Sequence, residues 1–131
     1  MAAKKKRKRK GHYHTGTHVS PKAGECKYRS GWEFAYLKWL DDNPDVVSYL
    51  YEGVEIPYVS NQRTKKVRNY WPDFYVTYAD GSRVLVEIKP SRKVKQATIQ
   101  KKIAAAQAWC VAQGATLKIL TEIELRLLGL L

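Results

Sequence analysis

The sequence predicts an α/β fold in which a mixed central β-sheet is flanked by helices. Short runs rich in β-branched and aromatic residues, which are typical of strands, occupy the middle of the chain. Helical patterns stand before and after these runs, and the last part of the chain reads strand, helix, strand, helix. If the two strands on either side of the first of these two helices are parallel, the strand–helix–strand unit forms a right-handed crossover. The 131 residues suffice for one hydrophobic core.

A helix is expected at residues 30–42. Ser30 is a suitable N-cap, and Glu33 follows three residues later, as in a capping box. The apolar stripe of this helix comprises Trp32, Tyr36, Leu37 and Leu40. Asn43-Pro44 ends the helix, because the residue before proline avoids helical geometry. Residues 12–29 lack a clear period and are interpreted as an extended or irregular lead-in.

Four strands are expected in the middle of the chain. Two short ones, 46–52 and 54–59, follow the helix, and the polar stretch 60–68 predicts a loop. Strands 70–78 and 83–89 form a hairpin, because a turn containing Asp-Gly lies between them.

The longest helix is expected at residues 93–113, with Gly114 just beyond its end. Its buried side is predicted to contain Val94, Ala97, Ile103, Ala104, Ala108 and Val111. The apolar run 115–120 predicts a buried strand beside the second hairpin strand. Thr121 then caps a final short helix at 122–128.

Positive charge is concentrated at the N-terminus of a chain whose net charge is +12. An unbroken run of seven cations consists of Lys4, Lys5, Lys6, Arg7, Lys8, Arg9 and Lys10. Such a run repels itself, so residues 1–11 are expected to form a disordered arm and residues 12–131 a single domain. Of the 24 Lys and Arg residues, seven lie in this run, so 17 stand against 12 acidic residues in the rest.

The arm predicts sequence-independent affinity for nucleic acid, because each cation on a phosphate releases a counterion. A nuclear localisation signal and a simple solubility tail remain open interpretations of the same run. The sequence has no apolar run that spans a bilayer and no signal peptide, so no membrane partner is expected. The low cysteine count favours a reducing compartment, although a disulfide between Cys26 and Cys110 stays open.

Three charged residues at the hairpin suggest metal chemistry. With a turn centred on Asp80-Gly81, Asp73 lies opposite Glu87 to Lys89, within one register step. Glu87 and Lys89 share a face because they are two residues apart. Asp73 joins them only if the hairpin loop has an odd length or a bulge shifts the parity.

Asp73, Glu87 and the backbone carbonyl of Ile88 are the expected ligands of one Mg²⁺, for which Mn²⁺ is expected to substitute. Such an ion polarises a phosphate and acidifies a bound water. Lys89 is expected to orient or deprotonate that water, or to stabilise the charge growing on the phosphate, and the sequence leaves these roles open. Glu33 is a fourth candidate ligand, with helix capping as its alternative role.

Three motifs in order resemble the PD-(D/E)XK nuclease superfamily: Ser30-Gly31-Trp32-Glu33, Tyr70-Trp71-Pro72-Asp73-Phe74 and Val86-Glu87-Ile88-Lys89-Pro90. Within it, the chain is similar to the TnsA-like endonucleases and the head-completion nucleases of tailed phages. The resemblance implies a restriction-endonuclease-like core and metal-dependent DNA cleavage. It also implies metal binding by Glu33, Asp73 and Glu87, with Lys89 acting on the water. The chain ends before a further C-terminal domain like that of TnsA, which favours the small phage type over a transposition role.

Further polar residues are expected to contact DNA. The cations flanking the catalytic strands are Lys65, Lys66, Arg68, Arg92, Lys93 and Lys95. They carry no base-reading pattern, which predicts phosphate contacts and little sequence specificity. Gln100 is a candidate phosphate contact, with a solvated helix face as its alternative. His12, His14 and His18, with Cys26, leave a zinc site open.

The predicted function is a Mg²⁺-dependent DNA endonuclease of phage head-completion or mobile-element type. The alternatives are a non-catalytic nucleic-acid-binding module and a structural virion protein. The expected setting is the cytoplasm of a bacterial host or the virion. A homodimer and contacts with phage head or portal proteins remain open.

Overall fold

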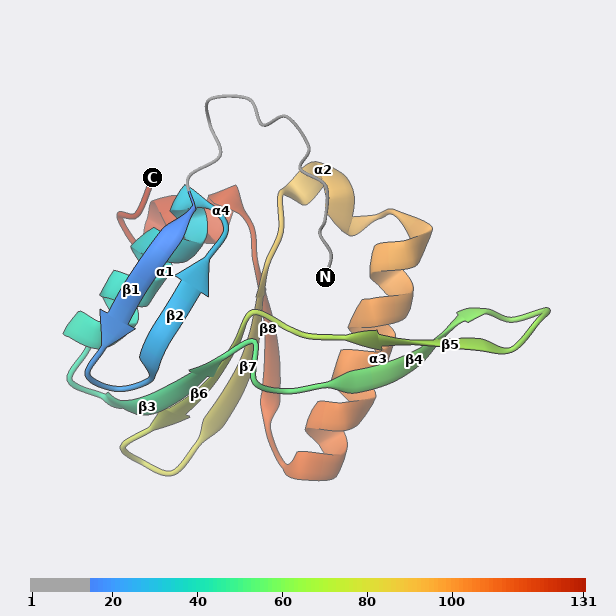
Figure 1. Ribbon diagram of the computed structural model, residues 1–131, viewed down its shortest axis with the longest axis horizontal. Helices are drawn as coiled ribbons and strands as arrows, with labels where there is room; N and C mark the ends of the chain where they lie inside the picture. The colour runs from blue at the N-terminus through green and yellow to red at the C-terminus, as the bar shows by residue number, and fades with distance from the viewer. Residues whose placement is uncertain (1–14) are drawn as a thin grey trace.

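A four-stranded mixed sheet lies at the centre of the fold. The computed structural model describes residues 15–131 and orders the strands β3-β6-β7-β8 (Figure 1). Their bounds are β3 Val46–Tyr51, β6 Phe74–Tyr78, β7 Arg83–Ile88 and β8 Thr116–Leu120. The first three strands are antiparallel, whereas β7 and β8 are parallel. The predicted mixed sheet is therefore confirmed, including the parallel strand at 116–120. The prediction that this strand is buried is wrong, because β8 lies at the edge of the sheet and buries only Leu120.

Helices cover both faces of this sheet (Figure 1). On one face, α1 (Gly31–Asp42) and α4 (Glu122–Leu127) bury Leu37, Leu40 and Leu125 against Phe74 and other sheet residues. On the other face, α3 (Ala97–Gln113) buries Ala106 and Cys110 beside Leu85 of β7. Because side chains alternate along a strand, Phe74 contacts Tyr36 of α1 while the next residue, Tyr75, contacts Trp109 of α3. The fold is thus of the restriction-endonuclease-like α/β class.

The lead-in at 12–29 is more regular than predicted where the structure describes it. β1 (Gly16–Ser20) and β2 (Gly24–Tyr28) form an antiparallel hairpin that packs on α1. Gly24 has φ +80°, so it meets the backbone requirement of the turn. Pro21 and Gly24 lie at the turn between two strands of only five residues each. Strands this short give too few residues for a clear alternation of apolar and polar side chains. The arm predicted at 1–11 lies outside the described residues, as do His12 and His14.

The loop predicted at 60–68 is wrong, because most of that stretch belongs to a two-stranded ribbon. β4 (Ile56–Asn61) pairs with β5 (Lys66–Tyr70) and not with the central sheet. The strand predicted at 70–78 consequently begins only at Phe74, after an irregular Trp71–Asp73 segment. β5 is exposed on both faces except at Tyr70, so it lacks the apolar alternation by which strands are recognised.

The helix predicted at 93–113 is interrupted. A short α2 (Ser91–Val94) precedes α3, and Lys95-Gln96 separate them. The predicted buried side is also wrong, because Ala97, Ala104, Ala108 and Val111 are exposed. Alanine occurs all around this helix, so the sequence defines no unique apolar stripe. Gly114 does adopt the predicted left-handed conformation, with φ 71°.

Both cysteines are free and buried, in two separate clusters of the core. The Cys26–Cys110 disulfide is therefore excluded. No helix within residues 15–131 is long and apolar enough to cross a membrane.

Candidate active site

The β6–β7 hairpin brings Asp73 and Glu87 to the same face of the sheet. Phe74 pairs with Val86, so the register continues to place Asp73 opposite Glu87. Tyr78 N donates to Ser82 O at 2.9 Å, which leaves a three-residue loop between them. An odd loop was the condition for the two carboxylates to share a face, and the structure meets it.

Asp73 is buried and held by backbone groups. Asp73 is only 8% exposed, and its Oδ2 accepts a hydrogen bond of 2.8 Å from Ile88 N. Its carbonyl accepts from Glu52 N at 2.9 Å, which fixes the start of β6 to the end of β3. Burial raises the pKa of Asp73 well above its usual range, and the negative charges of Glu87 and Glu33 add to the shift.

Glu87 lies equally deep and has two side-chain partners. Tyr70 Oη donates to Oε1 at 2.9 Å, and the Lys89 ammonium lies 3.5 Å from Oε2. Burial raises the pKa of Glu87, while the Lys89 charge acts in the opposite direction. Burial and the neighbouring Glu87 charge raise the pKa of Tyr70, so Tyr70 remains a protonated donor. The predicted group of two carboxylates and an amine is therefore assembled at the ends of β6 and β7.

Glu33 lies in the first turn of α1. Its Oε1 accepts from Tyr51 Oη at 2.6 Å and from Arg29 N at 2.9 Å. Ser30 Oγ caps the helix by accepting from Glu33 N at 3.1 Å. The capping box is incomplete in its predicted form, because the Glu33 carboxylate bonds Arg29 N and not the N-cap amide. The negative charge of Glu33 also contributes to the raised pKa of Asp73.

The electrostatics of the pair suit a divalent cation. Asp73 and Glu87 are buried side by side, and Lys89 is the one cation among their ion pairs within residues 15–131. Buried carboxylates with too little positive charge are poorly stabilised unless a further cation binds. Within residues 15–131, no three His, Cys, Asp or Glu side chains are gathered so as to hold a metal by themselves. A cation here therefore depends on the two carboxylates together with backbone oxygen, water or phosphate oxygen, which is the ligand set that Mg²⁺ usually takes.

The predicted DNA contacts lie on two elements beside the site. Lys66 and Arg68 are on β5 with Lys65 in the adjoining turn, and all three are exposed. The second group, Arg92, Lys93 and Lys95, lies on and just after α2, which follows Lys89 directly. Gln100 Nε2 donates to Val94 O at 2.6 Å, which joins α3 to α2. The Lys4–Lys10 run lies outside the described residues.

His18 is engaged in a different network, away from the carboxylate pair. Its Nε2 lies 2.6 Å from Asp41 Oδ2, and Asp41 Oδ1 accepts from Ser20 Oγ at 2.6 Å and Tyr49 Oη at 2.9 Å. Cys26 faces His18 across the β1–β2 hairpin but is fully buried. This arrangement joins the hairpin to α1.

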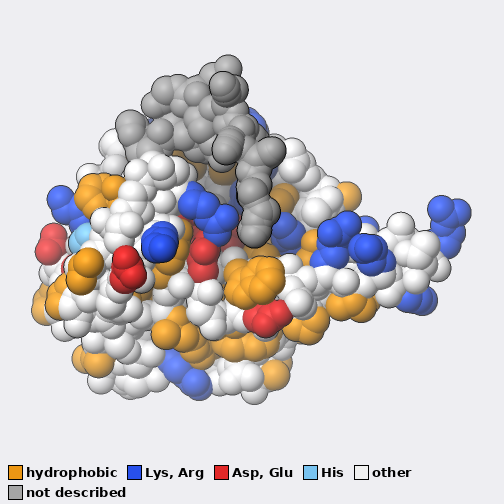
Figure 2. All heavy atoms as spheres, in the orientation of Figure 1, with side chains coloured by type: hydrophobic (Ala, Val, Ile, Leu, Met, Phe, Trp, Pro, Cys, Tyr) orange, Lys and Arg blue, Asp and Glu red, His pale blue; other side chains and the backbone are white. Residues whose placement is uncertain are grey.

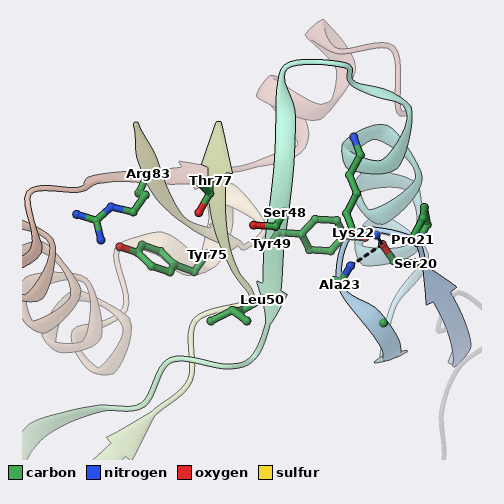
Figure 3. Close-up of a pocket in the computed structure, with 11 residues that line it drawn as sticks. Ser20, Pro21, Lys22, Ala23, Ser48, Tyr49, Leu50, Tyr75, Thr77 and Arg83 are labelled. Atoms are coloured by element: carbon green, nitrogen blue, oxygen red, sulfur yellow. Dashed lines mark hydrogen bonds between the residues drawn. The ribbon is translucent and has the colours of Figure 1, made fainter. Parts of the chain in front are cut away.

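A separate hollow of about 630 Å³ lies around β3 (Figure 3). It is lined by the β1–β2 turn and by Leu50, Tyr75 and Arg83, and none of the four candidate catalytic residues borders it. The hydroxyl of Tyr75 is buried without a hydrogen-bond partner in the described part of the chain. Because this hollow lies apart from Glu33, Asp73, Glu87 and Lys89, it is not part of the candidate active site.

Two tyrosines were not recognised from the sequence as partners of the acidic residues. Tyr70 donates to Glu87 and Tyr51 donates to Glu33. Tyr70 lies on a ribbon outside the central sheet, so no register rule could relate it to Glu87. The sequence indicated a role for Tyr70 at the site only through its position three residues before Asp73.

Comparison with known proteins defines the class. Residues 43–122 match the family described as TnsA-like endonuclease N terminal. That stretch contains Asp73, Glu87 and Lys89, and it begins after α1, which carries Glu33. The chain belongs to this endonuclease family.

A particular relative is similar over most of its length. The Head completion nuclease of Enterobacteria phage T4 is 33% identical over 124 residues, covering 78% of this chain and 82% of the relative. The resemblance to TnsA-like endonucleases and phage head-completion nucleases is thereby confirmed.

Proposed function

We propose that the chain is a divalent-metal-dependent endonuclease that hydrolyses DNA phosphodiester bonds with little sequence specificity. The observation that carries this proposal is the buried Asp73–Glu87 pair with the Lys89 ammonium 3.5 Å from Glu87. Membership in the endonuclease family and the net charge of +12 support a polyanionic substrate.

Asp73, Glu87 and the Ile88 carbonyl are the proposed ligands of Mg²⁺, with Glu33 as a further ligand through water, and Mn²⁺ is expected to substitute. When bound, the ion polarises the scissile phosphate and makes a coordinated water easier to deprotonate. The Ile88 amide fixes the Asp73 carboxylate, and the Tyr70 hydroxyl fixes that of Glu87. Both carboxylates are therefore preorganised before substrate arrives.

Lys89 follows Glu87 at the end of β7, on the same face of the strand. Its backbone N–H donates to Leu120 O at 2.9 Å, so the parallel β7–β8 pairing holds it in place. A positioned ammonium stabilises the negative charge that develops on a phosphate during in-line attack, or orients the attacking water.

We propose that the protein takes part in the completion of a phage head and acts in the bacterial cytoplasm or in the virion. The name and similarity of the phage T4 relative support it. Phage head or portal proteins are then the expected protein partners, and a homodimer is a further proposal.

The test is a cleavage assay on purified protein. Supercoiled plasmid, linear duplex, branched and single-stranded DNA are each incubated with Mg²⁺ or with EDTA. We expect cleavage with Mg²⁺ by the wild type and by Asp45→Ala, which removes an exposed carboxylate. We expect none with EDTA or from Asp73→Ala. Cleavage that persists in EDTA or survives Asp73→Ala overturns the proposal.

A further inference from the structure

The β4–β5 ribbon projects from the domain beyond α3 (Figure 1). Its base is anchored, because Ile56, Tyr58 and Tyr70 are buried in a cluster with Ala106 and Cys110 of α3. Lys101 Nζ also donates to Ser60 O at 2.8 Å. Every residue from 61 to 69 is exposed, so the outer half of the ribbon is largely open to solvent in the described chain.

This outer half has a strong and unneutralised positive charge. It contains Arg63, Lys65, Lys66 and Arg68, and no acidic residue occurs between positions 56 and 72. None of the ion pairs found within residues 15–131 uses these cations. Figure 2 shows Lys and Arg side chains gathered along the projection. A solvated strand pair with this charge attracts a polyanion.

One face of the ribbon leads directly to the carboxylate pair. Lys66, Arg68 and Tyr70 alternate along β5, so they share a face. Tyr70 is also the residue that donates to Glu87. At a rise of about 3.3 Å per residue, Arg68 and Lys66 lie roughly 7 and 13 Å along the strand from Tyr70. This is the length of about four base pairs of duplex.

The chemistry of the ribbon distinguishes duplex from unpaired DNA. Unpaired bases are usually bound by stacking on aromatic side chains, and residues 61–69 contain none. A two-stranded β-ribbon is, in contrast, narrow enough to enter the major groove, where cations on its edges reach phosphates of both strands. We propose that the β4–β5 ribbon is a duplex-binding arm that holds double-stranded DNA beside the Asp73–Glu87 pair. This inference rests on the proposed function, and it names duplex DNA as the substrate class.

The test measures DNA binding in EDTA, so that it does not depend on cleavage. The full-length ribbon variant R63Q/K65Q/K66Q/R68Q is compared with the matched control K27Q/K38Q/K118Q/R126Q. The control removes four exposed cations outside the ribbon. Both retain residues 1–14, so the N-terminal cations contribute equally. Fluorescence anisotropy with a random-sequence duplex and with one of its strands is recorded over a salt series, and thermal unfolding verifies that both variants fold.

We expect the ribbon variant to lose duplex affinity by about tenfold or more, with the salt slope reduced by about three to four. The wild-type preference for duplex over single strand should disappear in the ribbon variant and persist in the control. Equal behaviour of the two variants, or a wild type without duplex preference, overturns the inference. If ribbon-dependent binding is found but Mg²⁺-dependent cleavage is not, the proposed function fails separately.

Discussion

Asp73 combines burial, a single backbone donor to its side chain, and two acidic neighbours. A carboxyl whose pKa is higher in the folded than in the unfolded chain destabilises the folded state once the pH exceeds the unfolded value of about 3.9. The destabilisation is absent at a pH low enough for both states to be protonated. At this residue, catalytic function and stability are therefore expected to oppose one another.

Asp73→Asn should abolish cleavage and raise stability in metal-free buffer. Asparagine removes the charge but can still accept the Ile88 N–H bond. We expect a gain of about 1 kcal/mol at pH 7 that shrinks as the pH falls toward 4. Urea unfolding at several pH values measures it, with exposed Asp45→Asn as the control. A lower stability of Asp73→Asn at pH 7 would contradict the proposed electrostatics.

Tyr70→Phe tests whether a hydrogen bond orients Glu87. The substitution retains the ring, including its contact with the Lys102 ammonium, 5.6 Å from the ring centroid, and removes the hydroxyl that donates to Glu87. We expect a lower cleavage rate and a higher Mg²⁺ requirement, with a stability loss of about 1 kcal/mol. Tyr75→Phe is the matched control, because its buried hydroxyl has no partner in the described residues. Equal activity of the two variants would remove Tyr70 from the site.

At the scale of elements, Asp41 of α1 forms hydrogen bonds with His18 and Ser20 that connect the β1–β2 hairpin to the helix. Burial alone would raise the pKa of Asp41, but hydrogen bonds from Ser20, His18 and Tyr49 outweigh it and lower the pKa. A carboxylate with a lowered folded pKa stabilises the fold above its unfolded pKa. That stabilisation is lost as the pH falls through the folded pKa.

Asp41→Ala should lower stability by about 3 kcal/mol at pH 7, because three donors lose their acceptor. The difference from wild type should shrink as the pH falls below the unfolded pKa of about 3.9 and through the lower folded pKa. Urea unfolding at neutral pH and over a series of acidic pH values measures it. Asp42→Ala, at the exposed neighbouring position, is the control and should have little effect. A deficit that is independent of pH would mean that packing, and not the carboxylate, is what Asp41 supplies.

Elements with a clear apolar pattern were predictable from sequence, and elements without one were not. The α1 helix has a capping serine and a buried stripe, and β7 is a mainly apolar run that is buried along most of its length. In contrast, β5 is polar on both faces, and α3 has alanine all around it. Their placement depends on tertiary partners, Tyr58 and Leu85 among them, which a local pattern does not reveal.

The same distinction holds for the site. Asp73, Glu87 and Lys89 lie within one hairpin, where register arithmetic relates positions 14 to 16 residues apart. Tyr70 and Tyr51 reach the acidic residues from other elements, a ribbon outside the sheet and the edge strand β3. Their roles follow from how the elements assemble, so the sequence could not predict them.

At the scale of the whole molecule, charge is divided between the N-terminal run and the domain. Deleting residues 1–11 removes seven of the 24 cations. We expect an unchanged midpoint of thermal unfolding and a DNA-binding salt slope reduced by up to about six. Calorimetry and binding over a salt series measure the two quantities. A destabilised domain would show that these residues are part of the fold and not a separate arm.

The dependence of plasmid nicking on Mg²⁺ concentration tests the central claim most directly. We predict that the wild-type rate rises from zero and saturates, while Glu87→Gln stays near zero over the same range. A rate that is independent of Mg²⁺, or a Glu87→Gln curve that coincides with wild type, would contradict a phosphodiesterase site built on Asp73 and Glu87.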